Sequence, residues 1–372
     1  MRPILALLPA IYNLALLGRL RDAPGPFDPA VVRRILVVRN DNIGDVLCST
    51  PALDALRAAF PRAHIAALVC TLAQEVIEGH RALDELFVYP KAKHRQYGVL
   101  ESHGRLLAVL GRIRRRRFDL AVALRNSFST SQAWLTYASG ARWRLGPRAQ
   151  SAKQRWGFFY NLPADWPPPD QHEVLRCFHL LRHIGLDSPD KRLYLKIPDA
   201  SRAKVAEFLA SCGLDRGQGP VVLNITRWAY RPECSWPEHK YRALAQALAQ
   251  RPDGLVVTHA PGDRAWVEGI LAGLRPAVPT FWSPSLKDFA ACLARARAVI
   301  SAEGGPMHLV AAVNKPLVVM WSSTPLSVWK PWGIPCQVLG ATGPIEGISV
   351  EEVLAALERL PASAGPSGTA GQ

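Results

Sequence analysis

The chain has 372 residues, with 45 Lys and Arg against 30 Asp and Glu, and so carries a formal net charge of +15. Hydrophobic residues make up 49% and charged residues 20%, which excludes a disordered chain, a collagen-like fibre and a highly charged coiled coil. The length suggests two domains. The positive charge indicates an anionic partner, which is a nucleic acid, an acidic membrane surface or a phosphorylated small molecule.

The N-terminal stretch 1–20 is apolar apart from Arg2 and Arg19, and Pro9 interrupts it. The apolar part is shorter than the roughly 20 residues that span a bilayer. We expect either a helix lying on a membrane surface or a helix packed on the body of the protein. A cleaved signal peptide is the least favoured alternative, because no A-x-A-like site follows. Residues 1–32 are thus predicted to be an apolar segment and a linker.

The seven cysteines are scattered and form no C-x-x-C pair. We therefore expect neither a disulfide framework nor a zinc site. A reducing cytoplasm fits this cysteine usage best.

Short apolar runs alternate with stretches of helical spacing in the first half of the chain. The runs RRILVVRN, AHIAALVC, ELFVYP and FDLAVALRN are typical of buried strands. Strands alternating with helices predict a parallel sheet that is covered on both faces.

The alternation starts again after a polar, proline-containing stretch at 196–216, which we predict to be a linker. PVVLNI, GLVVTHAPG, RAVISAEGG and KPLVVMWSS read as strands. The sequence predicts an α/β protein with two doubly wound domains, 33–195 and 217–360, that face a cleft. Ligands bind such folds at the carboxyl ends of the strands and between domains. The low-complexity tail 361–372 is predicted to be disordered.

The first turn whose residues could carry chemistry follows the first predicted strand. Gly44 permits a tight turn or a close backbone approach, and the helix start offers free N–H groups to an anion. Asp45 is a candidate general base. The alternative is that Asp41 or Asp45 only caps the helix.

A second turn joins a strand to a helix within Ser301–His308. Gly304 and Gly305 leave room for a phosphate at the helix N-terminus, and Pro306 suits the first helical position. His308 could donate to a phosphate or a sugar, or it could be structural.

The third turn begins at Thr226. Guanidinium groups bind phosphate in a bidentate manner, so Arg227 and Arg231 suit a pyrophosphate. The alternative is a solvated, arginine-rich loop.

The run Arg114–Arg117 ends a predicted helix. It is either a solvated face favoured by the helix dipole or a contact with anionic lipid. A nucleic-acid partner is not expected, because the basic residues are spread through the chain and no nucleic-acid-binding signature is present.

Five segments together resemble the ADP-heptose:lipopolysaccharide heptosyltransferase family (glycosyltransferase family 9), over about residues 34–360. The segments are ILVVRNDNIGDVLCSTPALDALRAAFPRAHI, FDLAVALRNSFSTSQAWLTYASGARWRLG, HEVLRCFHLLRHIGL, SWPEHKYRALAQAL and SLKDFAACLARARAVISAEGGPMHLVAAVNKPLVVMWSSTPLSVWKPWG. The resemblance implies a GT-B fold, with two Rossmann-like domains that bind the acceptor on the first and the donor on the second.

The implied reaction is an inverting transfer of a heptose or related sugar from an ADP-sugar, or another nucleotide sugar, to a lipid-linked acceptor such as lipopolysaccharide core. Asp45 matches the family's general base. The implied donor-binding residues are Thr226, Arg227, Arg231, Glu303, Gly304, Gly305, Pro306, Met307 and His308. The implied acceptor-binding residues are Asn42, Gly44, Arg125 and Asn126. No cofactor or metal is implied, because N–H, Arg or Lys groups can stabilise the departing diphosphate.

The acceptor implies an anionic, lipid-linked partner and a peripheral place on the inner face of the cytoplasmic membrane. The chain departs from the family pattern at Glu303, where Asp is usual, at Cys234, where Lys is frequent, and at Ser322-Ser323, where a Gly-Pro-type turn is common. These departures motivate an alternative, which is a catalytically silent protein that binds a nucleotide sugar or a glycolipid.

Overall fold

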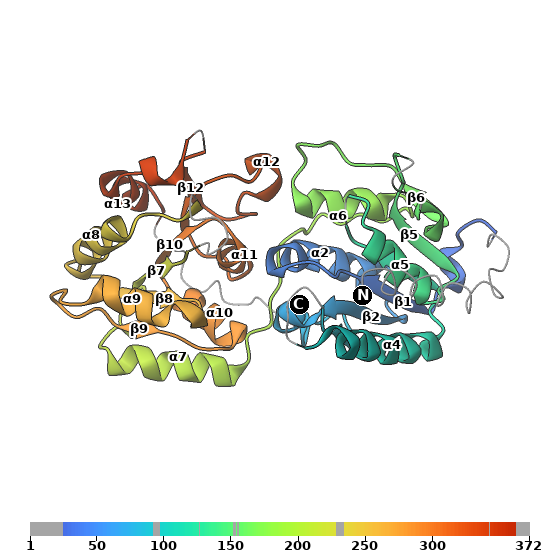
Figure 1. Cartoon of the computed structure of the whole chain (residues 1–372), viewed down its shortest axis with the longest axis horizontal. Coiled ribbons are helices and arrows are strands. Elements are labelled where there is room, and N and C mark those ends of the chain that lie inside the picture. Colours follow the sequence, from blue (N-terminus) through green and yellow to red (C-terminus); the bar gives the residue numbers. More distant parts are fainter. Residues whose placement is uncertain are drawn as a thin grey trace.

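The computed structural model describes residues 25–91, 97–125, 127–151, 154, 156–227, 234–341 and 343–361. The chain forms two lobes that lie side by side (Figure 1). The apolar stretch 1–20 and the tail from 362 onward fall outside the described residues, so the predictions made for them stay predictions.

The first lobe is built on a parallel sheet with the strand order β3-β2-β1-β4-β5-β6. Its strands are β1 (Arg34–Val38), β2 (His64–Cys70), β3 (Glu85–Tyr89), β4 (Leu120–Ala123), β5 (Trp143–Pro147) and β6 (Leu162–Ala164). Its helices are α2 (Ile43–Ala59), α3 (Gln74–Ile77), α4 (Val99–Arg116), α5 (Thr130–Ala138) and α6 (Glu173–Arg182), with the short turns η1 (Pro29–Val31), η2 (Thr71–Ala73) and η5 (Gly157–Phe159).

The second lobe repeats this topology, with the parallel order β12-β11-β10-β7-β8-β9. Its strands are β7 (Val221–Ile225), β8 (Leu255–His259), β9 (Thr280–Phe281), β10 (Ala298–Ala302), β11 (Leu317–Met320) and β12 (Cys336–Leu339). Its helices are α7 (Asp199–Ser211), α8 (Glu238–Ala249), α9 (Arg264–Leu271), α10 (Leu286–Arg295), α11 (Gly305–Ala312), α12 (Leu326–Trp329) and α13 (Val350–Glu358), with η7 (Pro261–Asp263) and η8 (Ile345–Gly347).

The burial of the strands reflects helices that cover both faces of each sheet. Every residue of β4, β7, β10 and β11 is buried, as expected for strands with helices on both faces. One continuous apolar cluster includes residues of β1 and α2 from the first lobe and of α10 and α11 from the second. The hydrophobic core therefore joins the two lobes.

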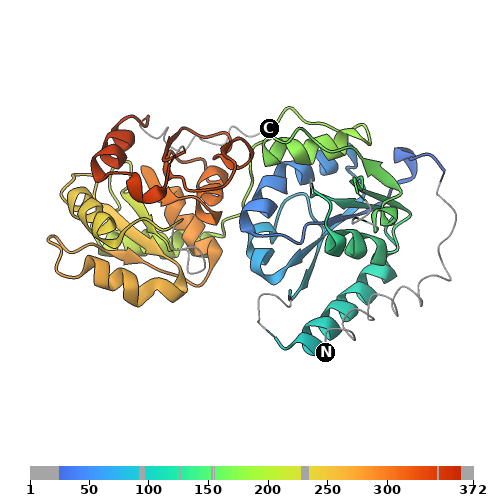
Figure 2. The same cartoon turned by 45° about the horizontal axis from the view of Figure 1, so that its top comes forward.

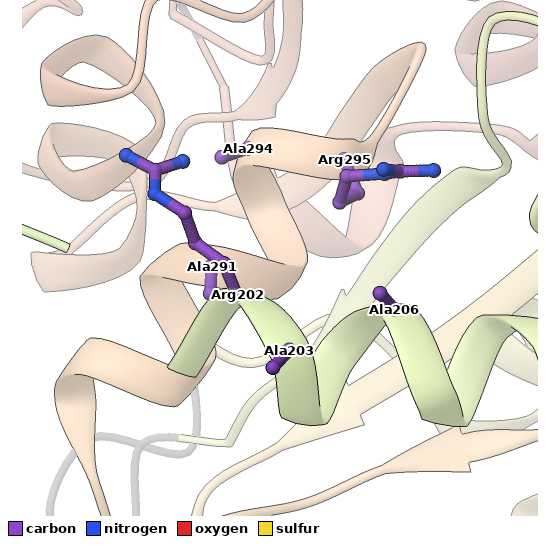
Figure 3. A pocket seen from close by; sticks show the side chains of 6 residues that line it. All are labelled: Arg202, Ala203, Ala206, Ala291, Ala294 and Arg295. Carbon is purple, nitrogen blue, oxygen red and sulfur yellow. The ribbon is translucent and has the colours of Figure 1, made fainter. Parts of the chain in front are cut away.

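The stretch 196–216, predicted to be a linker, contains a helix. Helix α7 occupies most of it and packs on α10 of the second lobe. A shallow groove of about 320 Å³ lies between these two helices, where small side chains face each other and the two arginines extend away from one another (Figure 3). The groove is lined by Arg202, Ala203, Ala206, Ala291, Ala294 and Arg295.

Both sheets reverse their strand order at a single point, between β1 and β4 and between β7 and β10. In doubly wound folds, ligands bind outside the carboxyl ends of the strands at this point. The turn after β1 and the turn after β10 both start there. Helices α2 and α11, which follow these turns, pack against each other where the lobes meet (Figure 1). Within the ranges described above, no helix is both long and apolar enough to cross a membrane.

Candidate active site

Arg39, directly after β1, is the charged centre of the first turn. Its guanidinium is buried and lies 2.7 Å from Glu173 Oε1 and 3.5 Å from Asp45 Oδ1. Its Nε lies 3.6 Å from Asp41 Oδ2, and Nη1 donates to the carbonyl of Leu124. Burial lowers the pKa of Arg39, but Glu173, Asp41 and Asp45 together raise it by more than burial lowers it, so the net shift is upward.

Asp45 lies at the start of α2 and is 23% exposed. Its Oδ2 accepts a hydrogen bond from the backbone N–H of Asn42 at 3.2 Å, so Asp45 caps the helix, as the structural alternative predicted. Its other oxygen faces Arg39. Burial raises the pKa of Asp45, while the Arg39 charge opposes that rise. A partly exposed carboxylate with a raised pKa has the properties of a general base.

The predicted acceptor residues line the same end of the first sheet. Arg125 follows β4 and pairs with Asp41 through Nη1 and Oδ1 at 2.5 Å. The N-cap of α2 is Asn42, not Asp41. Asn42 is the residue before α2, and Gly44 is buried in its first turn. Asn126 falls outside the described residues.

The second turn has the backbone that its glycines predict. Gly304 has φ 134° and ψ −163°, a conformation that favours glycine. Pro306 lies in the first turn of α11. A Cβ on Gly305 would lie 3.7 Å from Ile43 Cγ2, so this turn directly faces the first turn of α2 in the other lobe.

His308 lies in the contact between the lobes. A Cβ on Gly44 would lie 2.5 Å from Cδ2 of His308, so the imidazole fills the space that a side chain at position 44 would need. The His308 Nδ1 is 3.7 Å from Cys48 Sγ, and its ring meets Trp329 edge to face. In this arrangement His308 and Gly44, predicted to bind donor and acceptor, contact each other.

Glu303, the residue before the two glycines, is buried, and its carboxylate accepts hydrogen bonds from the loop Ser322–Thr324. Met307 is also buried. Glu303 and Ser322-Ser323, two of the positions at which the sequence departs from the family pattern, are therefore hydrogen-bonded to each other.

The third turn is described only at its ends. Thr226 accepts from the hydroxyl of Tyr241 through its carbonyl oxygen at 3.4 Å. Arg227 is exposed, pairs with Asp263 at 2.8 Å and lies over the ring of Trp266. Arg231 falls outside the described residues.

Sequence reasoning missed two residues that hold this region together. Glu173 is the buried partner of Arg39 and begins α6. His172, just before it, contacts the second lobe through the carbonyl of Lys330 at 2.8 Å and the ring of Trp332. Nothing in the sequence around Glu173 signals that its partner, Arg39, follows a strand far away in the chain.

A second contact between the lobes is also polar. Glu75, on α3, accepts from Ser285 Oγ at 2.7 Å and from the backbone N–H of Lys287 at 3.2 Å, at the start of α10. The residues described by the structure include no cluster of His, Cys, Asp or Glu that could hold a metal ion.

The Gly44–His308 contact leads to the first prediction. Gly44→Ala places a methyl group against the imidazole, so we expect a lower melting temperature and a larger radius of gyration in small-angle X-ray scattering. The control is Gly111→Ala, in α4, where a Cβ meets open space and alanine favours the helix by about 0.5–1 kcal/mol. Equal melting temperatures for the two variants would contradict the contact.

The second prediction concerns pH. Burial, with a smaller contribution from His172, lowers the pKa of His308 to about 3, against roughly 6.5 when unfolded. As the pH falls below about 6.5, His308 takes up a proton in the unfolded chain but stays unprotonated in the folded chain. Between pH 7 and pH 5, His308 should cost roughly 2 kcal/mol of unfolding free energy.

Urea unfolding at the two pH values measures this loss. His308→Gln should reduce the pH dependence by about that amount. If His308→Gln kept the full pH dependence, the ring would not be neutral and buried.

The family was assigned by comparison with known proteins. The sequence model described as Glycosyltransferase family 9 (heptosyltransferase) matches residues 106–345. Lipopolysaccharide heptosyltransferase 3 of Escherichia coli is 26% identical over 297 residues, which cover 78% of this chain and 83% of that protein. Lipooligosaccharide heptosyltransferase 2 of Haemophilus ducreyi is 22% identical over 306 residues, which cover 80% and 86%.

Solved structures agree on the fold. A glycosyl transferase family 9 structure from Veillonella parvula superposes with a TM-score of 0.74 at 21% identity, over 88% of this chain and 96% of that one. The E. coli heptosyltransferase with ADP-2-deoxy-2-fluoro heptose gives 0.69 at 22% identity, over 87% and 99%. The two Rossmann-like lobes thus form a GT-B fold, as predicted. Since the family match spans more than half of the chain, this protein is a glycosyltransferase and belongs to glycosyltransferase family 9, the heptosyltransferases.

Proposed function

We propose that the protein transfers a heptose or related sugar, with inversion, from an ADP-sugar or another nucleotide sugar to a lipid-linked saccharide such as lipopolysaccharide core. One observation carries the proposal. A partly exposed carboxylate, Asp45, stands in the first turn of α2, next to residues that face the glycine turn of the other lobe. The names of the heptosyltransferase relatives support the same donor and acceptor classes.

In the proposed step, an acceptor hydroxyl gives its proton to Asp45. The oxygen forms a bond to the anomeric carbon while the bond to the nucleoside diphosphate breaks on the opposite face, so the configuration inverts. Positive charge builds on the sugar ring and negative charge on the leaving group, as in an oxocarbenium-like transition state. Arg39 favours the ionised form of Asp45, because its charge opposes the rise in the pKa of that carboxyl that burial causes.

The diphosphate is proposed to lie at the N-terminus of α11, where free N–H groups favour an anion. Gly304 and Gly305 leave space for it, Pro306 starts the helix, and Met307 and His308 support the turn from within the lobe. Thr226, Arg227 and Arg231 are proposed to complete the donor site, and Asn42, Arg125 and Asn126 to orient the acceptor. Arg227 would then exchange its contact with Asp263 for a phosphate.

A peripheral membrane contact is part of the proposal, because the acceptor carries a lipid. Helix α4 lies at the periphery of the first lobe (Figure 2). Leu100 and Leu107 on it are 79% and 44% exposed, and Arg105, Arg112 and Arg116 are exposed on another side of the same helix. A peripheral helix that exposes both leucines and arginines suits an anionic lipid surface. Arg116 and Arg114 also make contacts within the lobe, with Glu85 and the carbonyl of Ala138.

A second candidate function is a catalytically silent binder of nucleotide sugars. It is favoured by Glu303, whose carboxylate is bound within the loop Ser322–Thr324, and by Cys234, which is buried. Donor binding without any transfer would identify this case.

The third prediction distinguishes sugar transfer from binding without transfer. Asp45→Asn should lower the transfer rate by about 10²–10⁴-fold, the usual contribution of a general base, and leave the melting shift caused by ADP-heptose unchanged. Asp54→Asn, on the same helix and paired with Arg81, should transfer at the wild-type rate. Equal transfer by Asp45→Asn and wild type would remove Asp45 as the base.

The fourth prediction concerns the membrane. Leu100→Glu with Leu107→Glu should lower binding to phosphatidylglycerol vesicles roughly tenfold, because two apolar side chains no longer enter the lipid surface. Leu72→Glu, also in the first lobe and 44% exposed, serves as the control in the same sedimentation assay. Unchanged vesicle binding by the double variant would exclude α4 as the membrane-facing surface.

A further inference from the structure

Three loops meet at the reversal point of the second sheet. Strand β10 lies between β11 and β7, so the segments that follow these strands emerge side by side. Glu303 follows β10, Ser322–Thr324 follows β11, and Cys234 lies between β7 and α8. The three departures from the family pattern are thus neighbours in space.

The carboxylate of Glu303 is saturated by the loop after β11. Its Oε1 accepts from the Ser322 hydroxyl, and from the backbone N–H and hydroxyl of Ser323 at 3.1 and 3.3 Å. Its Oε2 accepts from the hydroxyl and backbone N–H of Thr324 at 3.0 and 3.4 Å. A carboxylate offers about four lone-pair sites, so no site is left for a hydroxyl group of the donor.

The same loop reaches the segment that follows β7. The Ser323 hydroxyl lies 3.7 Å from the buried thiol of Cys234. Ser323 is exposed, whereas Glu303 below it is buried. The loop therefore covers the Glu303 carboxylate at the end of β10. Its hydroxyl groups donate inward to that carboxylate, while the residue Ser323 is exposed on the outer side.

The loop also leads into the contact between the lobes. It runs into α12, on the side of the second lobe that faces the first (Figure 1). Trp329 of α12 meets the ring of His308, 6.0 Å between centroids. The carbonyl of Lys330, just after it, bonds to His172 of the first lobe. The position of Ser322–Thr324 thus affects both the glycine turn and the lobe contact.

We propose that Glu303 is a positioning residue rather than a ligand of the sugar. Its buried carboxylate holds Ser322–Thr324 across the end of β10. The wall of the donor site is then the outer side of this uncharged loop, on which Ser323 is exposed. This uncharged wall takes the sugar part of a nucleotide sugar. This inference rests on the proposed function, because it assumes that the donor binds at the turn after β10.

The test is calorimetric binding of ADP-heptose, with ligand-free melting recorded for every variant. Glu303→Ala should weaken binding roughly tenfold, because the loop loses a charged acceptor. Glu303→Gln should fall between this variant and wild type, since its amide oxygen can serve one side of the loop while its NH₂ group faces the N–H of Thr324. Glu351→Gln, exposed on α13, is the control and should bind as wild type.

Ser323→Ala distinguishes positioning from direct contact. If Glu303 acts through the loop, Ser323→Ala combined with Glu303→Ala should bind about as weakly as Glu303→Ala alone. Additive losses would mean that Glu303 contacts the donor itself and would overturn the inference. So would unchanged affinity in a Glu303→Gln or Glu303→Ala variant that melts near the wild type. If the wild type binds neither ADP-heptose nor any other nucleotide sugar, the proposed function itself fails, and this outcome is seen without any substitution.

Discussion

The site depends on one buried guanidinium. Arg39 lies among Glu173, Asp45 and Asp41 at the end of β1 and bonds to a carbonyl after β4. Three carboxylates at this spacing would repel one another and take up protons without a central positive charge. Arg39 therefore joins α2, α6 and the sheet, and it favours the ionised form of the one carboxylate that is partly exposed. Removing it would leave the buried carboxylates with less compensating positive charge, which is destabilising.

Contacts between the lobes place the two turns opposite each other. Gly44 and His308 fit together at the centre, while Glu75 with the start of α10, and His172 with the segment after α12, meet around them. His308 is held neutral by burial, so its first role in this arrangement is packing. A donor bound at the start of α11, as proposed, would lie beside this contact.

Much of the architecture could be predicted from the sequence, because it is encoded locally. Apolar runs alternating with helical spacing give two parallel sheets, and Gly304 before Gly305 marks a backbone that needs glycine. The partners of buried charges could not be predicted in this way. Glu173 is far from Arg39 in the chain, and Glu303 is far from Ser322–Thr324, so only the fold brings them together. The helix α7 was missed because its stretch is polar and begins beside a proline, and its exposed alanines give it little amphipathic signal.

The central claim is that a sugar moves from a nucleotide to a saccharide in one displacement between the lobes. The most direct measurement follows the anomeric proton by NMR while the wild-type protein acts on ADP-heptose and a heptose-bearing lipopolysaccharide core acceptor. We predict a linked product whose anomeric configuration is opposite to that of the donor. A product that retains the configuration of the donor, or bound donor that never forms a linkage, would contradict this mechanism.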